Sequence, residues 1–175
     1  VGANNGDLIA NESIISKIKV TANGASVGLQ RLTYELDLFD ANVANLALDN
    51  FKLFKGPNSD DLVENVSIVK ASNNASVADG QAGVVGPGTT KELVYITFDD
   101  EEAVIVNSPL TFTLKATVVS PGTDDTISTR LAIDDENTPV RITNALTCGA
   151  GNNVACTNGN STSGKVLETN QVSFQ

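Results

Sequence analysis

The stretch "LTFTLKATV", residues 110–118, alternates between apolar and polar side chains along its whole length. A period of two is typical of a β-strand that buries one face and exposes the other. A helix would instead repeat its apolar residues every three or four positions, and no such spacing persists over ten residues of this chain. The stretch therefore predicts a half-buried strand of an antiparallel sheet.

Two further stretches repeat the pattern, "LTYELDL" (32–38) and "ISTRLAI" (127–133). Turn sequences such as Asn23-Gly24 separate the alternating segments, because these residues tolerate the backbone angles of tight turns. We expect about ten strands, at residues 13–21, 28–39, 46–54, 62–70, 92–98, 103–106, 110–119, 126–134, 139–146 and 165–174. Short strands at this spacing predict an all-β, antiparallel β-sandwich of the immunoglobulin-like kind. We expect one domain over residues 13–175, preceded by an N-terminal extension over residues 1–12.

The composition favours a globular protein and argues against several partners. With 175 residues, 41% of them hydrophobic, the chain is long enough to bury a core of its own. Its formal net charge of −10 opposes binding to nucleic acids and to anionic membranes. No apolar run approaches the roughly 18 residues that a membrane-spanning helix requires. We therefore expect neither nucleic-acid binding nor membrane insertion.

Two features predict secretion. The chain contains no methionine, so Val1 is not a translation start; a processed secreted protein is the expectation and a trimmed chain is the alternative. Cys148 and Cys156, the only cysteines, enclose a Gly/Asn-rich loop that can close into a disulfide worth roughly 2–3 kcal/mol. Their spacing fits no zinc site, and no histidine is present to complete one. A disulfide implies an oxidising, extracellular or cell-surface location.

Enzymatic activity is not expected. The lack of histidine excludes Ser-His-Asp and Cys-His catalysis. Ser67 and Lys70 have the spacing of an acyl-serine motif, but in a predicted strand residues three apart face opposite sides. Glycosidase-like carboxylate pairs are present, but the chain has no Trp to line a sugar-binding cleft.

Acidic runs suggest calcium as the one candidate metal, since calcium prefers several oxygen ligands from loops. The candidate ligands lie in two runs at predicted strand ends: Asp99, Asp100 and Glu101, and Asp134, Asp135 and Glu136. The alternative is a solvated acidic surface that keeps the protein soluble. Four N-x-S/T sequons would permit covalent glycans, at Asn11, Asn65, Asn74 and Asn160.

The succession "LQRLTYELDL … LDNFKLFKG … GPGTTKELVYITF … LTFTLKATVV" resembles the immunoglobulin-like β-sandwich modules of bacterial surface and surface-layer proteins. The resemblance covers roughly residues 14–134. It implies an extracellular, structural or adhesive role rather than catalysis. Some surface sandwiches of this kind also carry a covalent Lys–Asn crosslink, which the sequence leaves open.

The N-terminal extension suggests how copies of the chain would join. Leu8, Ile9, Ala10 and Ile14 form a candidate donor segment that would add a strand to a neighbouring copy's sheet. The C-terminal "NQVSFQ" (170–175) is the rival donor. Repeated head to tail, such a contact does not close and gives a filament. We therefore expect a structural subunit of an extracellular filament whose partners are other copies of itself. The alternative is a monomeric module of a cell surface, surface coat or adhesin. One form of this alternative is a module that bound calcium stabilises.

Overall fold

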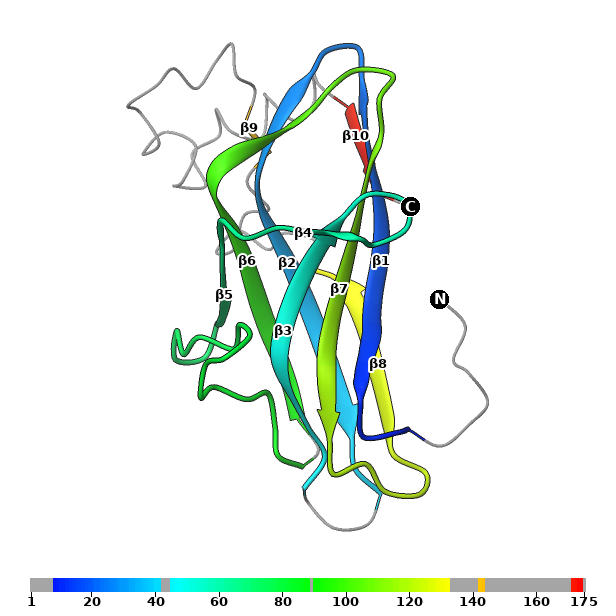
Figure 1. The fold of residues 1–175 in the computed structure, drawn as a ribbon, viewed down its shortest axis with the longest axis vertical. Helices are drawn as coiled ribbons and strands as arrows, with labels where there is room; N and C mark the ends of the chain where they lie inside the picture. Colours follow the sequence, from blue (N-terminus) through cyan, green and yellow to red (C-terminus); the bar gives the residue numbers. More distant parts are fainter. Residues whose placement is uncertain (1–7, 42–44, 89, 133–141, 144–170, 175) are drawn as a thin grey trace.

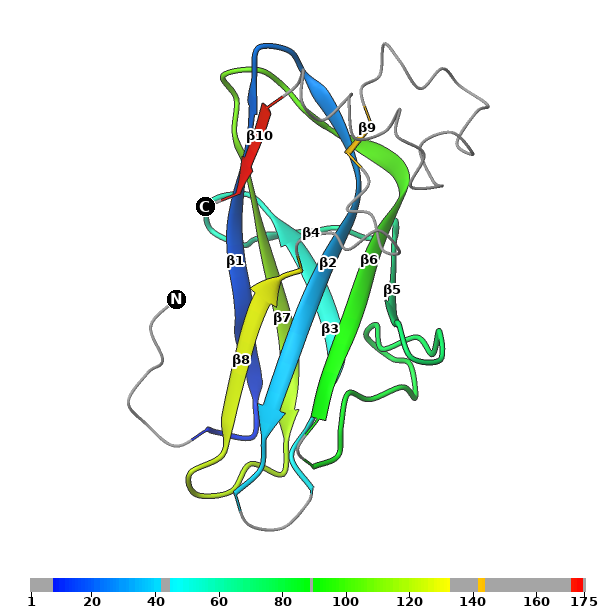
Figure 2. The same cartoon turned by 180° about the vertical axis from the view of Figure 1, so that it is seen from behind.

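The computed structural model describes residues 8–41, 45–88, 90–132, 142–143 and 171–174. Every regular element within them is a β-strand, and the strands form two antiparallel sheets packed face to face (Figures 1 and 2). The prediction of an all-β, antiparallel sandwich is therefore confirmed. No helix in these ranges has the length and hydropathy needed to cross a membrane.

The first sheet has the strand order β10-β1-β7-β3-β4, and the second has the order β5-β6-β2-β8, with β9 also paired to β2. The strands have these bounds: β1 (Glu12–Asn23), β2 (Val27–Phe39), β3 (Ala47–Lys55), β4 (Asp61–Leu62), β5 (Val66–Lys70), β6 (Thr90–Val104), β7 (Leu110–Val119), β8 (Thr126–Leu131), β9 (Ile142–Thr143) and β10 (Gln171–Phe174). The chain crosses between the sheets at β1–β2, β2–β3, β4–β5, β6–β7 and β7–β8, and β9 and β10 also belong to different sheets.

The core lies between the sheets and is built by the alternation seen in the sequence. On β7, Phe112, Leu114, Ala116 and Val118 are buried, while Lys115 is on the outer face. The matching residues of β2 are fully buried as well: Leu32, Tyr34, Leu36 and Leu38. The buried apolar side chains of the described residues form one cluster.

Two predicted strands differ from the structure. The single strand expected at 62–70 is divided into β4 and β5, which belong to different sheets, because the exposed Glu64 and Asn65 cross from one sheet to the other. Conversely, the strands expected at 92–98 and 103–106 are one continuous strand, β6. The acidic run between them is therefore part of a sheet and not a loop.

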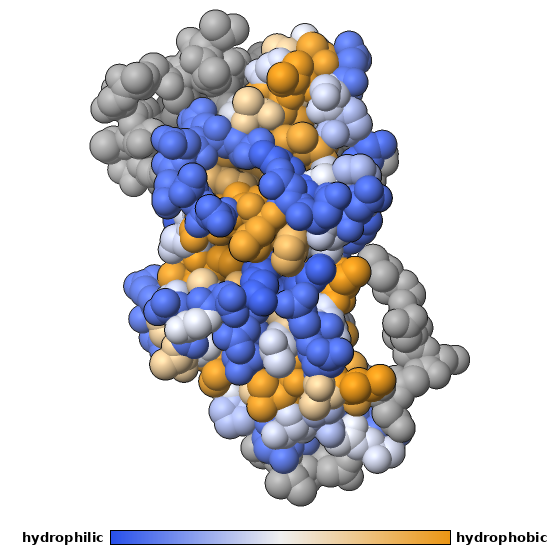
Figure 3. Space-filling view, in the orientation of Figure 1, coloured by the Kyte–Doolittle hydropathy of each residue, from blue (hydrophilic) through white to orange (hydrophobic). Residues whose placement is uncertain are grey.

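The outer face of the first sheet is largely hydrophilic. Figure 3 shows blue, hydrophilic groups over most of it, with orange, hydrophobic groups in its middle and near its lower end. Among the apolar side chains that remain exposed are Ile9, Ile14 and Phe39. Ile14 is on β1, near the start of that strand.

Candidate functional site: an open sheet edge

One side of the sandwich is sealed by a backbone strap, residues 76–88. The N–H of Val77 donates to the carbonyl of Ile68 on β5 at 3.0 Å, and the N–H of Phe51 on β3 donates to the carbonyl of Val77 at 2.9 Å. Leu48 of β3 and Val85 exchange two hydrogen bonds of 2.8 Å. Val77 and Val85 are fully buried. The strap therefore connects the two sheets and pairs with backbone groups of both β3 and β5 on this side.

The opposite side, formed by β1 and β8, is different (Figure 2). From Glu12 to Val20, β1 pairs with β7 along one edge. Along its other edge, β10 pairs only with Val20–Asn23. Within the part of the chain that the structure describes, residues 12–19 therefore have no strand on their outer side. We call residues 12–19 the open edge.

The register determines which backbone groups point out of the open edge. Antiparallel ladders alternate between pairs that exchange hydrogen bonds and pairs that do not. The carbonyl of Asn11 accepts a hydrogen bond from the N–H of Val118 at 3.0 Å, and a bulge leaves Ile15 without a partner in β7. Counting from Asn11 past this bulge, the residues whose N–H and C=O point away from β7 are Glu12, Ile14, Lys17 and Lys19. The side chains of the same four residues are exposed.

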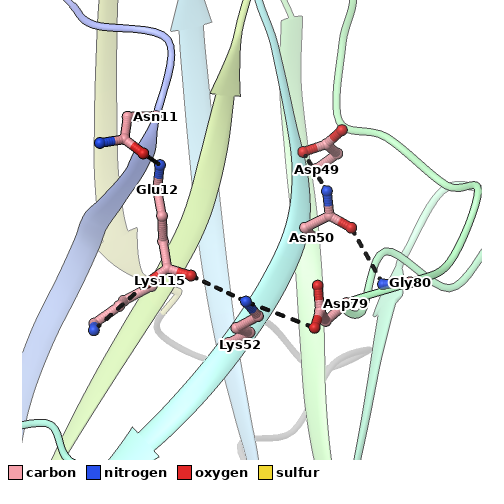
Figure 4. A network of polar contacts seen from close by, with 8 residues as sticks. All are labelled: Asn11, Glu12, Asp49, Asn50, Lys52, Asp79, Gly80 and Lys115. Atoms are coloured by element: carbon pink, nitrogen blue, oxygen red, sulfur yellow. Dashed lines mark hydrogen bonds and ion pairs between the residues drawn. The ribbon is translucent and has the colours of Figure 1, made fainter.

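A polar network holds the start of this edge in place (Figure 4). Glu12 Oε2 lies 3.1 Å from Lys52 Nζ on β3, and Glu12 Oε1 lies 3.6 Å from Lys115 Nζ on β7. Lys52 also reaches Asp79 of the strap at 3.6 Å. Lys115 Nζ lies 4.2 Å from the ring centroid of Phe54. Glu12 therefore connects β1 to two neighbouring strands, and Lys52 extends the connection to the strap.

The two lysines change the ionisation of Glu12. The hydrogen bond from Lys52 lowers the pKa of Glu12, with smaller contributions from the charges of Lys52 and Lys115, while desolvation opposes the shift. The same hydrogen bond raises the pKa of Lys52. On the other sheet, hydrogen bonds from Arg130 and then Lys91 likewise lower the pKa of Glu35. Each sheet thus carries one glutamate paired with two cations.

Replacing Glu12 by Gln should make the unfolding free energy less dependent on pH. A folded-state pKa below the ordinary value of 4.5 stabilises the protein above that value, and this contribution is lost as the pH falls through the folded pKa. At pH 7 the substitution should lower the free energy of unfolding by less than about 1 kcal/mol, because the Glu12 side chain is 37% exposed and solvent screens its ion pair. Urea unfolding of both proteins at pH 7 and at pH 3 measures this difference. Glu64→Gln, at an exposed residue without an ion pair in the described structure, is the control; an equal effect there would contradict the role of Glu12.

The structure places the residues of the predicted donor segment on their own domain. Leu8 packs against the core, and β1 begins at Glu12, so that Ile14 belongs to the domain's own first strand. Ile9 and Ile14 are 73% and 59% exposed, and Ala10 is exposed too. Residues 1–7 lie outside the described residues. Strand donation from the N-terminus stays a prediction, but the strand paired here with β7 is not free to be donated without breaking that pairing.

The predicted calcium ligands fall in a bulge of β6. Arg31 of β2 pairs with Thr97 and Leu29 pairs with Glu102, so residues 98–101 of β6 lie opposite Gln30 alone. Three of these four bulged residues are Asp99, Asp100 and Glu101. Bulges of this kind redirect side chains and are frequent near binding sites.

A depression of about 550 Å³ lies beside this bulge. Its lining includes apolar Leu62, Val63 and Phe98 and the carboxylates of Asp61, Glu64 and Asp100. Lys55 also lines it and pairs with Glu102 at 3.1 Å. Across the described ranges, no group of three or more ligand-type side chains comes together as a metal site. Asp134, Asp135 and Glu136 lie outside those ranges, so calcium stays a prediction.

The remaining predicted sites are placed in part. Asn11, Asn65 and Asn74 are exposed, as glycan attachment would require. Asn160 and both cysteines, Cys148 and Cys156, lie outside the described residues. The sequence reading missed the strap and the Glu12 network. The charged residues of that network, Glu12, Lys52, Asp79 and Lys115, are far apart in sequence. The pairing of β1, β7 and β3, with the bonds of the strap to β3, brings them together.

Comparison with known proteins gave no match. No protein-family model, no curated protein and no solved structure is significantly similar to this chain. A function must therefore be inferred from the geometry of the chain itself.

Proposed function

We propose that this protein is a structural subunit of an extracellular assembly and that its partners are other copies of itself. The observation that carries the proposal is the open edge of β1, residues 12–19, on a sandwich whose other side is sealed by residues 76–88. A row of unpaired N–H and C=O groups is a template for adding a strand from another chain. Extending the sheet across this edge joins sandwiches without requiring a cofactor.

The immunoglobulin-like class and the secreted location belong to the same proposal. The repeated crossings of the chain between the two sheets support the class, since sandwiches of that class alternate sheets in this way. The exposed sequons and acidic surface agree with an extracellular protein. A head-to-tail filament is the form of assembly that strand donation would produce, with the N-terminal extension (residues 1–12) or the C-terminal strand β10 as the donated element.

Lys17→Pro should weaken self-association while leaving the monomer folded. The substitution removes an N–H that points out of the open edge, places a proline ring there, and leaves the bonds to β7 intact. We expect the dissociation constant to rise about tenfold or more, because a backbone hydrogen bond is lost and the strands are held apart. Sedimentation velocity over a range of protein concentrations, with negative-stain microscopy of the same samples, measures it.

Thr129→Pro is the matched control, because it removes an N–H that faces outward from β8, the neighbouring edge strand. Equal losses in both variants would contradict a specific role for β1. A full chain that stays monomeric at every concentration would overturn the proposal and favour the monomeric surface module. For that alternative, a loss of thermal stability on adding a chelator would identify the calcium-stabilised version.

A further inference from the structure

The open edge has a length and a pattern that suit one particular partner strand. The free stretch runs from Glu12, where β1 begins, to Lys19, after which β10 covers the edge. The stretch has eight residues, so its midpoint lies between Ile15, the bulge residue that has no partner in β7, and Ser16. An antiparallel strand added here over the whole stretch is centred on this point.

We propose that the open edge binds the open edge of a second copy, antiparallel and related by a two-fold axis between Ile15 and Ser16. This inference rests on the proposed self-association through the open edge and specifies the partner segment and its register. It gives a closed dimer, so a filament would require a second contact. The axis places Glu12 opposite Lys19 of the second copy. It also places Ile14 opposite Lys17 of the second copy. Every pairing occurs twice, because the interface is symmetric.

The backbone supports this register. Glu12, Ile14, Lys17 and Lys19 are the residues whose N–H and C=O groups point out of the edge, and the two-fold axis pairs these residues only with one another. All outward-pointing groups can therefore form the hydrogen-bonded pairs of an antiparallel ladder. Between the two Ile14–Lys17 pairs each copy contributes two residues, Ile15 and Ser16, so the bulges do not shift the register of the outer pairs. The stretch also ends where β10 begins, so the added strand does not displace β10.

The side chains support it as well. All four residues have exposed side chains, so the pairs lie together on the outer face. Opposite charges directly across a ladder are favourable and like charges are unfavourable. Lys19 makes no ion pair within the described chain, and Ile14, 59% exposed, would be partly covered by the added strand. Moving the axis to Lys17 would instead place two Lys17 side chains opposite each other.

The first test of the register uses two charge-reversal variants, one at each end of the open edge. Lys19→Glu and Glu12→Lys should each weaken the dimer about tenfold or more, because each places like charges opposite each other twice. An equimolar mixture of the two variants should recover the dimer, since both contacts then join opposite charges. Lys70→Glu, on β5 at the sealed side, is the control and should change nothing. Sedimentation velocity measures all four samples.

Cysteine mapping tests the register without altering Glu12, whose network supports the fold. A mixture of Ile14→Cys and Lys17→Cys chains should form a disulfide between these two positions, and neither variant should crosslink to itself there. Peptide mass spectrometry separates this bond from any made by Cys148 or Cys156. Crosslinking of Ile14→Cys chains to each other would overturn the register.

The failure of this inference can be distinguished from the failure of the proposed function. If the full chain associates and Lys17→Pro weakens the association, but the mixture of charge-reversal variants does not recover the dimer and the 14–17 crosslink does not form, the symmetric pairing is wrong and the open edge receives another segment. If the full chain does not associate, both proposals are wrong.

Discussion

Replacing Phe112 by Ala should lower the free energy of unfolding by about 3–5 kcal/mol. Phe112 is on β7, the strand between β1 and β3, and its side chain is fully buried. Its ring meets the ring of Phe98, from the opposite sheet, edge-on with a centroid distance of 5.7 Å and an interplanar angle of 61°. The substitution removes this contact and leaves a cavity between the sheets. Guanidinium unfolding followed by far-ultraviolet circular dichroism measures the change.

Phe39→Ala supplies the matched control for this prediction. Phe39 is the last residue of β2 and is 53% exposed, so the same truncation should cost less than about 1 kcal/mol. A loss at Phe112 no larger than the loss at Phe39 would show that the two sheets do not pack as described.

Gly83→Ala should destabilise the fold by about 2–3 kcal/mol by loosening the strap. A Cβ atom at Gly83 would overlap the carbonyl oxygen of Ser76, which is backbone and cannot turn aside as a side chain would. Because the strap holds β3 and β5 together through Val77, we also expect faster hydrogen exchange at the N–H of Phe51. Chemical unfolding and hydrogen-exchange mass spectrometry measure the two effects.

A second glycine of the strap separates steric overlap from backbone strain. Gly80 has a φ of +73° and open space around its Cβ position, so Gly80→Ala should cost only about 1 kcal/mol. If Gly83→Ala costs no more than this, the strap tolerates displacement and does not seal the side of the sandwich.

Most of the fold could be predicted from the sequence because alternation is a local signal. The strand expected at 110–119 is β7 with the same bounds, and the buried residues of β2 are those that its pattern predicts. Alternation reports which face of a strand meets the core, and it needs no knowledge of neighbouring strands. Alternation gave the wrong strand at residues 62–70, because Glu64 and Asn65 carry the chain from one sheet to the other. It also missed that residues 99–101, which the sequence suggested were a loop, belong to β6.

The candidate site could be predicted only in part, since an edge is a property of the assembled sheet. The sequence drew attention to Ile14 but assigned it to a segment for donation, whereas the structure pairs it with Lys115 of β7. Nothing in the order of residues 12–19 shows that β7 covers one side of them and that β10 stops at Val20. The acidic residues 99–101 were singled out by composition, but their place in a bulge depends on the register between β2 and β6.

By itself, the sequence determined the all-β class, the buried face of the principal strands and the acidic surface, because these follow from side-chain type and a period of two. The tertiary structure alone decided which side of the sandwich is sealed and which strand edge stays open. It also decided that Glu12 lies between Lys52 and Lys115, which are 40 and 103 positions away in the sequence shown. Such features depend on which strands become neighbours, and the pairing of distant segments is determined by the packing of the whole core.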